Sequence, residues 1–185
     1  MKKVTFTMML LLMTLANQAQ ECNYYKNEVD EFTGITKIVM ESESFISHTD
    51  SSILKYYKKN KEQYLEVEIY TAKLNETYIL YFYAVFQTKK AYEYYGVVSK
   101  GSKISLKLSD GTIAELTISK SDFGDMDYDK GTTTYSSYCI LGNSELETLK
   151  SSEIDKVRIY WSKGYESYDC DSPGLLIKQL NCLEK

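Results

Sequence analysis

Residues 78–86 read Y-I-L-Y-F-Y-A-V-F, a run of nine residues without a charged side chain. The run is too short to cross a membrane as a helix, and its aromatic and β-branched side chains favour a strand. A continuous apolar run of this length is typical of a strand whose two faces are both covered. We therefore expect residues 78–86 to form the central strand of a packed β domain.

Two hairpins are predicted from alternating sequence patterns. Residues 64–70 alternate apolar side chains with glutamates, which is typical of a half-buried strand, and a short loop joins them to the central run. Residues 103–108 and 113–118 alternate in the same way on either side of Asp110 and Gly111. Asp-Gly between two alternating runs is a strong hairpin signal, because both residues tolerate positive φ.

The rest of the chain adds further short strands and two helices. A capping-box pattern, S-E-L-E at residues 144–147, predicts a short helix over residues 145–151, and Pro173 suits the start of a C-terminal helix. Residues 51–61 fit a short strand or a turn. The connections do not supply the crossover helices that a parallel sheet needs. The sequence thus predicts a mainly β fold, an antiparallel β-sandwich or open barrel with one short internal helix and a C-terminal helix.

Residues 1–20 have the features of a signal peptide. Lys2 and Lys3 supply a positive start, an apolar stretch follows, and Ala19 offers a small residue at the cleavage point. The apolar stretch is too short for a membrane anchor, so we expect no transmembrane anchor in the mature chain. Residues 21–185 then form a single β-rich domain that is exported, either periplasmic or secreted. The 26 acidic residues outnumber the 22 basic ones, which argues against nucleic acid as a partner.

Three segments carry a resemblance to a group of proteins. Residues 28–34 read E-V-D-E-F-T-G, residues 103–118 contain the Asp-Gly turn, and residues 147–165 end in R-I-Y-W-S-K-G-Y. Together they resemble small exported proteins of unknown function that are frequent in Bacteroidota. The resemblance implies a bacterial envelope or secreted setting, and it implies no activity or site.

The mature chain has four cysteines, and export would allow them to form disulfides. We expect Cys170 and Cys182 to be bonded, because this bridge would pin a short C-terminal helix to the strand before it. An alternative pairing joins Cys22 to Cys182 or to Cys170 and leaves Cys139 free in the core. Free thiols throughout are a third alternative, since four cysteines alone do not fix a pairing.

An acidic loop provides a candidate metal site. Asp125, Asp127 and Asp129 lie in D-M-D-Y-D-K-G, where alternating carboxylates could bind Ca²⁺. Gly131 comes one place later than the glycine of an EF-hand loop, and Ser136 stands where the closing glutamate should be. A solvated acidic loop is therefore the alternative, and we expect no other cofactor.

The sequence gives little support to an active site. His48 is the only histidine, and we place it in a surface loop, because no nucleophile motif such as G-x-S-x-G accompanies it. The chain has so many acidic residues that no spacing singles out a carboxylate pair for hydrolysis. Catalysis is thus less expected than binding.

Tyrosine is the most unusual feature of the composition, with 18 residues. Its ring and hydroxyl suit glycan stacking and protein interfaces, although tyrosine is also common on half-exposed strands. We expect a non-enzymatic module that binds a protein or a glycan. The alternatives are a structural or envelope-accessory protein without a small ligand, and a hydrolase with an unrecognised carboxylate site. The candidate ligand-binding residues are Tyr92, Tyr94, Tyr95, Tyr160, Tyr165 and Tyr168.

Overall fold

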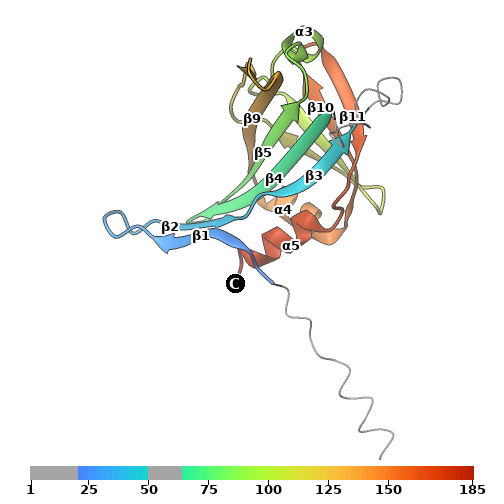
Figure 1. Ribbon diagram of the computed structural model, residues 1–185. Coiled ribbons are helices and arrows are strands. Elements are labelled where there is room, and N and C mark those ends of the chain that lie inside the picture. Colours follow the sequence, from blue (N-terminus) through green and yellow to red (C-terminus); the bar gives the residue numbers. More distant parts are fainter. Residues whose placement is uncertain (1–20, 50–63) are drawn as a thin grey trace, which may run out of the picture.

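The computed structural model describes residues 21–49 and 64–185. The predicted signal peptide and the strand or turn at residues 51–61 lie outside the described residues. Within them the chain forms two antiparallel sheets that pack as an open sandwich, with three short helices (Figure 1). The prediction of a mainly β, sandwich-like fold is confirmed.

The larger sheet has seven strands in the order β1-β2-β4-β5-β9-β8, and β3 pairs with the same edge of β4 as β2 does. The central apolar run forms β5, an interior strand of this sheet as predicted, and it lies between β4 and β9. The strands of this sheet are β1 (Tyr24–Val29), β2 (Thr36–Met40), β3 (Glu43–His48), β4 (Leu65–Leu74), β5 (Thr77–Phe86), β8 (Asp125–Asp127) and β9 (Thr132–Leu141).

The smaller sheet has four strands in the order β11-β10-β6-β7. The predicted Asp-Gly hairpin is confirmed, because β6 and β7 pair directly and Gly111 has a φ of 89°. Ser109 and Asp110 are not at positive φ, so the turn is not the expected type I′: the backbone N–H of Gly111 donates to the carbonyl of Leu108, and Gly111 alone adopts the left-handed conformation. The strands are β6 (Lys103–Leu108), β7 (Ile113–Thr117), β10 (Ile154–Trp161) and β11 (Gly164–Asp169).

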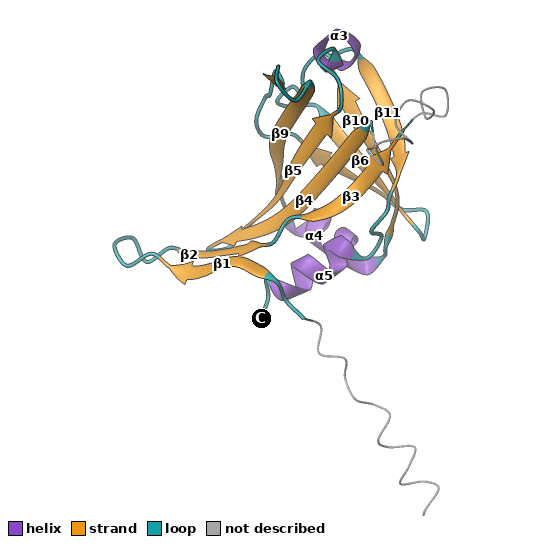
Figure 2. Cartoon of the chain, in the orientation of Figure 1, coloured by secondary structure: helices purple, strands orange, loops and turns teal. Residues whose placement is uncertain are grey.

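The helices α4 (Asn143–Ser151) and α5 (Leu175–Cys182) lie together at one end of the sandwich, and α3 (Ala91–Tyr95) lies at the other (Figure 2). The internal and C-terminal helices were both predicted, whereas α3 was not. The predicted capping box does not form: α4 begins at Asn143 with Gly142 as its N-cap, so Ser144 already lies inside the helix.

Side chains of both sheets fill the space between them. A residual void at Val67, Leu106 and Ile159 has a volume of about 20 Å³, room for about one water molecule. The inward-facing residues of β5 belong to this core, including Phe82 and Phe86. A ligand the size of a sugar therefore has no room at this position between the sheets.

A disulfide joins Cys22 to Cys182, with 5.7 Å between their Cα atoms, and Cys139 and Cys170 have free thiols. The predicted Cys170–Cys182 bond is therefore wrong, and the alternative that ties the two ends of the domain together is present. Burial raises the pKa of the Cys139 thiol to about 12 and that of Cys170 to about 11, so both favour the unreactive protonated form.

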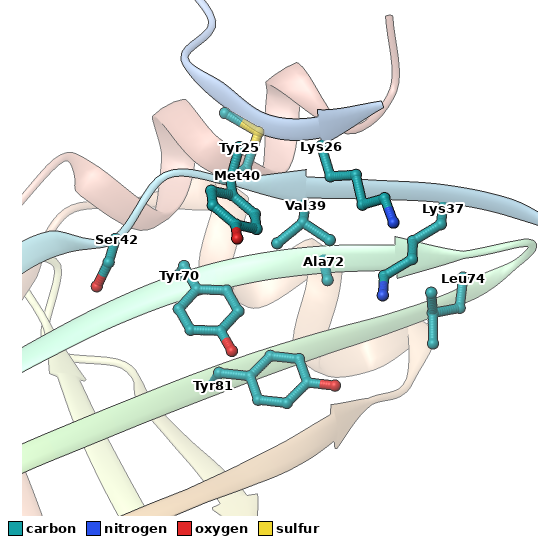
Figure 3. Close-up of a pocket in the computed structure, with 10 residues that line it drawn as sticks. All are labelled: Tyr25, Lys26, Lys37, Val39, Met40, Ser42, Tyr70, Ala72, Leu74 and Tyr81. Carbon is teal, nitrogen blue, oxygen red and sulfur yellow. The ribbon is translucent and has the colours of Figure 1, made fainter. Parts of the chain in front are cut away.

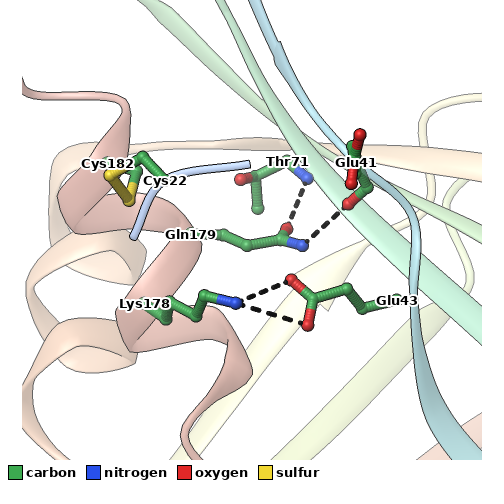
Figure 4. Close-up of polar contacts among 7 residues, drawn as sticks. All are labelled: Cys22, Glu41, Glu43, Thr71, Lys178, Gln179 and Cys182. Atoms are coloured by element: carbon green, nitrogen blue, oxygen red, sulfur yellow. Dashed lines mark hydrogen bonds and ion pairs between the residues drawn. A yellow bond between two sulfur atoms is a disulfide. The ribbon is translucent and has the colours of Figure 1, made fainter. Parts of the chain in front are cut away.

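Polar contacts of α5 explain this pairing (Figure 4). Gln179 is buried, its side-chain oxygen accepts from the backbone N–H of Thr71 at 2.9 Å, and its Nε2 donates to the carbonyl of Glu41 at 3.1 Å. The Lys178 amino group lies 3.2 Å from the carboxylate of Glu43. These contacts hold α5 along β4 and the β2–β3 bend, and the last turn of the helix then meets the start of β1.

Candidate functional site

A row of three tyrosines crosses the outer face of the larger sheet. Tyr70 on β4, Tyr81 on β5 and Tyr138 on β9 lie directly opposite one another in the strand register. The rings of Tyr70 and Tyr81 stack with centroids 4.7 Å apart, and those of Tyr81 and Tyr138 are 5.5 Å apart and tilted. We call these three residues the tyrosine row.

A tight turn sets the register of this row. β4 ends at Leu74 and β5 begins at Thr77, so only Asn75 and Glu76 lie between the paired strands. Asn75 adopts a φ of 51°, a left-handed conformation that asparagine tolerates better than most residues. The short turn brings Tyr70 opposite Tyr81, and the long β5–β9 pairing then adds Tyr138.

Tyr83 lies on the same face of β5 two residues after Tyr81 and continues the aromatic surface. Its neighbours on the adjacent strands are Glu68 on β4 and Ser136 on β9. Its side chain is 44% exposed, whereas the rings of the tyrosine row are half-buried against each other. Tyr83 therefore offers the most accessible ring among these four tyrosines.

The outer face is hollowed in three adjoining places, which we call together the outer groove. A central hollow of about 290 Å³ lies over the tyrosine row, Tyr83 and Lys120. It shares Tyr70 and Tyr81 with a hollow of about 460 Å³ on one side, and Tyr83 with one of about 480 Å³ on the other. The outer groove is thus a continuous surface with tyrosines at its centre.

One end of the outer groove is apolar with a basic rim. Figure 3 shows Val39, Ala72 and Leu74 as its floor, with the amino groups of Lys26 and Lys37 directed over it. Lys26 forms an ion pair of 2.6 Å with Glu28 on the same face of β1. This end combines van der Waals surface with positive charge.

The other end of the outer groove is polar and acidic. It is lined by Tyr83, Val85, Gln87, Asp122, Asp125, Asp127, Lys130, Thr132, Thr134 and Ser136. Asp122 accepts hydrogen bonds from the backbone N–H groups of Gly124 at 2.7 Å and Ser136 at 2.8 Å. These bonds hold the loop before β8 against β9 and fix the position of the Asp122 carboxylate.

Asp127 is fixed in a similar way by the turn after β8. Its Oδ1 accepts from the backbone N–H of Lys130 at 2.9 Å and of Asp129 at 3.0 Å. The hydrogen bond from Lys130 is the main reason that the pKa of Asp127 lies below its usual value. The carboxylate therefore stays ionised at neutral pH.

The structure does not bring together Asp125, Asp127 and Asp129, the residues predicted as calcium ligands. Asp125 and Asp127 line the outer groove, whereas Asp129 lies in the turn beyond it. Residues 21–49 and 64–185 contain no group of three or more His, Cys, Asp or Glu side chains that could hold a metal ion. Asp125 and Asp127 belong to the short strand β8. Asp127 also accepts the backbone hydrogen bonds of the turn that follows, in which Asp129 lies.

The six tyrosines predicted as a ligand site do not lie together. Tyr92 and Tyr94 are exposed on α3, and Tyr160 pairs with Tyr165 on the smaller sheet at 5.6 Å between ring centroids. Tyr168 is only 2% exposed and packs edge-on against His48. His48 was expected in a surface loop, but it is the last residue of β3.

The sixth of them, Tyr95, belongs to an aromatic cluster in the core. We call Phe86, Tyr95, Tyr135 and Trp161 the inner aromatic cluster; the centroids of its contacting rings are 4.5–5.9 Å apart. The Tyr135 hydroxyl donates to the carbonyl of Gly96 at 2.8 Å, and burial raises the pKa of Tyr135 to about 12. These rings stabilise the fold and present no accessible surface at Tyr135.

The comparisons with protein families, with curated proteins and with solved structures found no match for this chain. No helix within the described residues is long and apolar enough to cross a membrane.

Proposed function

We propose that this protein is an exported, non-enzymatic module that binds a glycan on the outer groove. The observation that carries the proposal is the accessible ring of Tyr83, which continues the tyrosine row and adjoins a wall of hydroxyl and carboxylate groups. A sugar presents an apolar face of C–H groups and a rim of hydroxyls. The face can pack on an aromatic ring, and the rim can bond to fixed polar groups.

The composition of the acidic end of the outer groove favours a glycan over a protein. Protein interfaces are depleted in aspartate, serine and lysine and enriched in aromatic residues, methionine and arginine. The acidic end of the outer groove has three aspartates, Ser136 and two threonines, and no arginine or methionine among its lining residues. Fixed carboxylates such as Asp122 and Asp127 are strong acceptors for sugar hydroxyls.

Two features support export. Residues 1–20 carry the charge and hydropathy pattern of a signal peptide, and the Cys22–Cys182 disulfide suits an oxidising compartment. We expect protein recovered from the periplasm or the medium to begin near Gln20. Intact mass measurement checks this, and full-length protein in the membrane fraction would contradict it.

A glycan array tests the binding proposal directly. Labelled mature protein is applied at about 10 µM, a concentration that detects the micromolar binding of a shallow site. We expect the wild type to bind a subset of glycans, Tyr83→Ala to lose that binding, and Tyr94→Ala, an exposed tyrosine on α3, to retain it. Absence of wild-type binding to every glycan, or equal loss with both variants, would overturn the proposal.

A further inference from the structure

β1 and β2 form an arm, residues 24–40, that projects from the sandwich (Figure 1). Its base is held by the Cys22–Cys182 disulfide and by the Tyr24 hydroxyl, which donates to the Cys182 carbonyl at 2.9 Å. In the described part of the chain, β1 pairs only with β2, so its other edge is open. The arm is thus anchored at its base and carries an unpaired strand edge.

The arm also exposes apolar side chains. Val29 is 62% exposed, Ile35 is 40% exposed and Phe32, at the tip, is 95% exposed. Isolated exposed apolar residues are ordinary, but a group of them beside an open strand edge is a typical site for pairing with another chain.

The hydrogen bonds of the arm show which residues face the open edge. The backbone N–H of Asp30 donates to the carbonyl of Ile35 at 2.9 Å, inside the hairpin. Successive residues of a strand direct their N–H and C=O groups to opposite edges. Asn27 and Val29 therefore present these groups to the open edge, while Glu28 bonds toward β2.

The charges on either side of Asn27 would complement those of a second copy of the same strand. Lys26 and Glu28 lie on the same face of β1, one on each side of Asn27. If a second β1 pairs antiparallel with the dyad axis at Asn27, each Lys26 lies opposite Glu28 of the second copy. Opposite charges at directly opposed positions stabilise a strand pair, and a two-fold axis forms every such contact twice.

From this edge and its charges we infer that a second copy of this chain pairs with β1 and joins the two larger sheets into one. The same register directs the apolar tip at Phe32 toward the base of the second copy's arm. A dyad perpendicular to the sheet places both outer grooves on one side of the joined sheet. The dimer then presents two copies of the groove in one plane, which suits a repeating or surface-bound ligand. The pairing itself does not depend on what the grooves bind.

Crosslinking and charge exchange test the pairing in the full mature chain. Cysteine in place of Asn27 would lie next to its copy across the dyad, within the Cα separation that a disulfide spans. We expect N27C to form a disulfide-linked dimer under mild oxidation. D110C, at an exposed turn of the smaller sheet, is the matched control and stays largely monomeric. Equal crosslinking of the two variants would overturn the pairing.

Sedimentation equilibrium provides the second arm of the test. We expect the wild type to dimerise reversibly, and K26E or E28K to raise the dimer dissociation constant about tenfold or more, because like charges then face each other twice. The double exchange K26E/E28K restores the opposed charges and returns the constant to within about threefold of wild type. Unchanged thermal midpoints confirm that the variants fold. A wild type that stays monomeric up to about 1 mM, or a double exchange no better than the single ones, contradicts the inference.

Discussion

The two faces of β5 use the same class of side chain for opposite purposes. Phe82 and Phe86 point between the sheets and are buried, whereas Tyr81 and Tyr83 point outward and keep contact with solvent. Successive side chains of a strand point to opposite faces of the sheet. A strand with aromatic residues at both odd and even positions therefore contributes rings to the core and to the outer surface. The hydroxyl group distinguishes the outward tyrosines from the inward phenylalanines, because tyrosine can pack its ring while its hydroxyl stays in contact with water.

Tyr135 and Tyr81 extend this comparison to a single residue type. Tyr135 lies in the inner aromatic cluster with a bonded hydroxyl, while Tyr81 is the middle member of the tyrosine row. Burial raises the pKa of both phenols. Tyrosine in the core therefore contributes to stability, whereas tyrosine on the outer face keeps part of its ring accessible to solvent.

The largest effect is expected from removing the core ring. Tyr135→Ala leaves a cavity beside Phe86 and Trp161 and should lower the free energy of unfolding by about 3–5 kcal/mol. Urea unfolding followed by the fluorescence of Trp161, the only tryptophan, measures this. A loss below about 1 kcal/mol would mean that Tyr135 is not a core residue.

A smaller effect is expected from the Tyr135 hydroxyl. Tyr135→Phe removes one buried hydrogen bond and should cost about 1 kcal/mol at neutral pH. The pKa of Tyr135 in the folded protein is about 12, above the value of about 10 in an unfolded chain. The stabilisation by the protonated phenol is therefore present below about pH 10 and is lost as the pH rises toward 12.

Unfolding measured at several pH values checks this sign. Tyr135→Phe should lose less stability than the wild type between pH 10 and about 12, because it has no phenol to ionise. Tyr81→Phe, whose phenol is only half-buried, is the control and should follow the wild type more closely. Identical alkaline curves for the wild type and Tyr135→Phe would contradict a raised pKa at this position.

The smallest effect on stability is expected from the outer face. Tyr81→Ala removes two cross-strand ring contacts and should cost about 0.5 kcal/mol, since each such pair contributes only a few tenths. Equilibrium unfolding of Tyr81→Ala and Tyr135→Ala under the same conditions gives the ratio of their losses in free energy of unfolding. Equal losses would mean that the outer row is as structural as the inner aromatic cluster.

The sequence predicted β5 and its central place but not its two different faces. An uncharged run favoured a strand covered on both sides, and this prediction is wrong for Tyr83. The run is apolar only if tyrosine is treated as apolar, and the tyrosine hydroxyl lets the side chain remain at a solvated surface. A two-residue turn at Asn75 and Glu76 would have revealed the pairing of Tyr70 with Tyr81, because hairpin register follows from loop length.

Other parts of the site depend on contacts that no local pattern carries. Tyr138 joins the row through the pairing of β5 with β9, which lies far along the chain. The Cys22–Cys182 bond depends on how α5 lies along β4, and Gln179 holds that position from within the helix. Nearness in the sequence was therefore a poor guide to a shared surface: Tyr92 and Tyr94 are exposed on α3, whereas Tyr95 packs against Phe86.

Affinity electrophoresis tests most directly whether recognition belongs to the outer face of β5. Native gels containing a soluble polysaccharide that bears the glycan bound on the array are run beside gels without it. We expect the wild type and the α3 double variant Tyr92→Ala/Tyr94→Ala to be retarded equally, while Tyr81→Ala/Tyr83→Ala migrates as in the empty gel. Retardation of Tyr81→Ala/Tyr83→Ala together with free migration of the α3 variant would contradict the assignment.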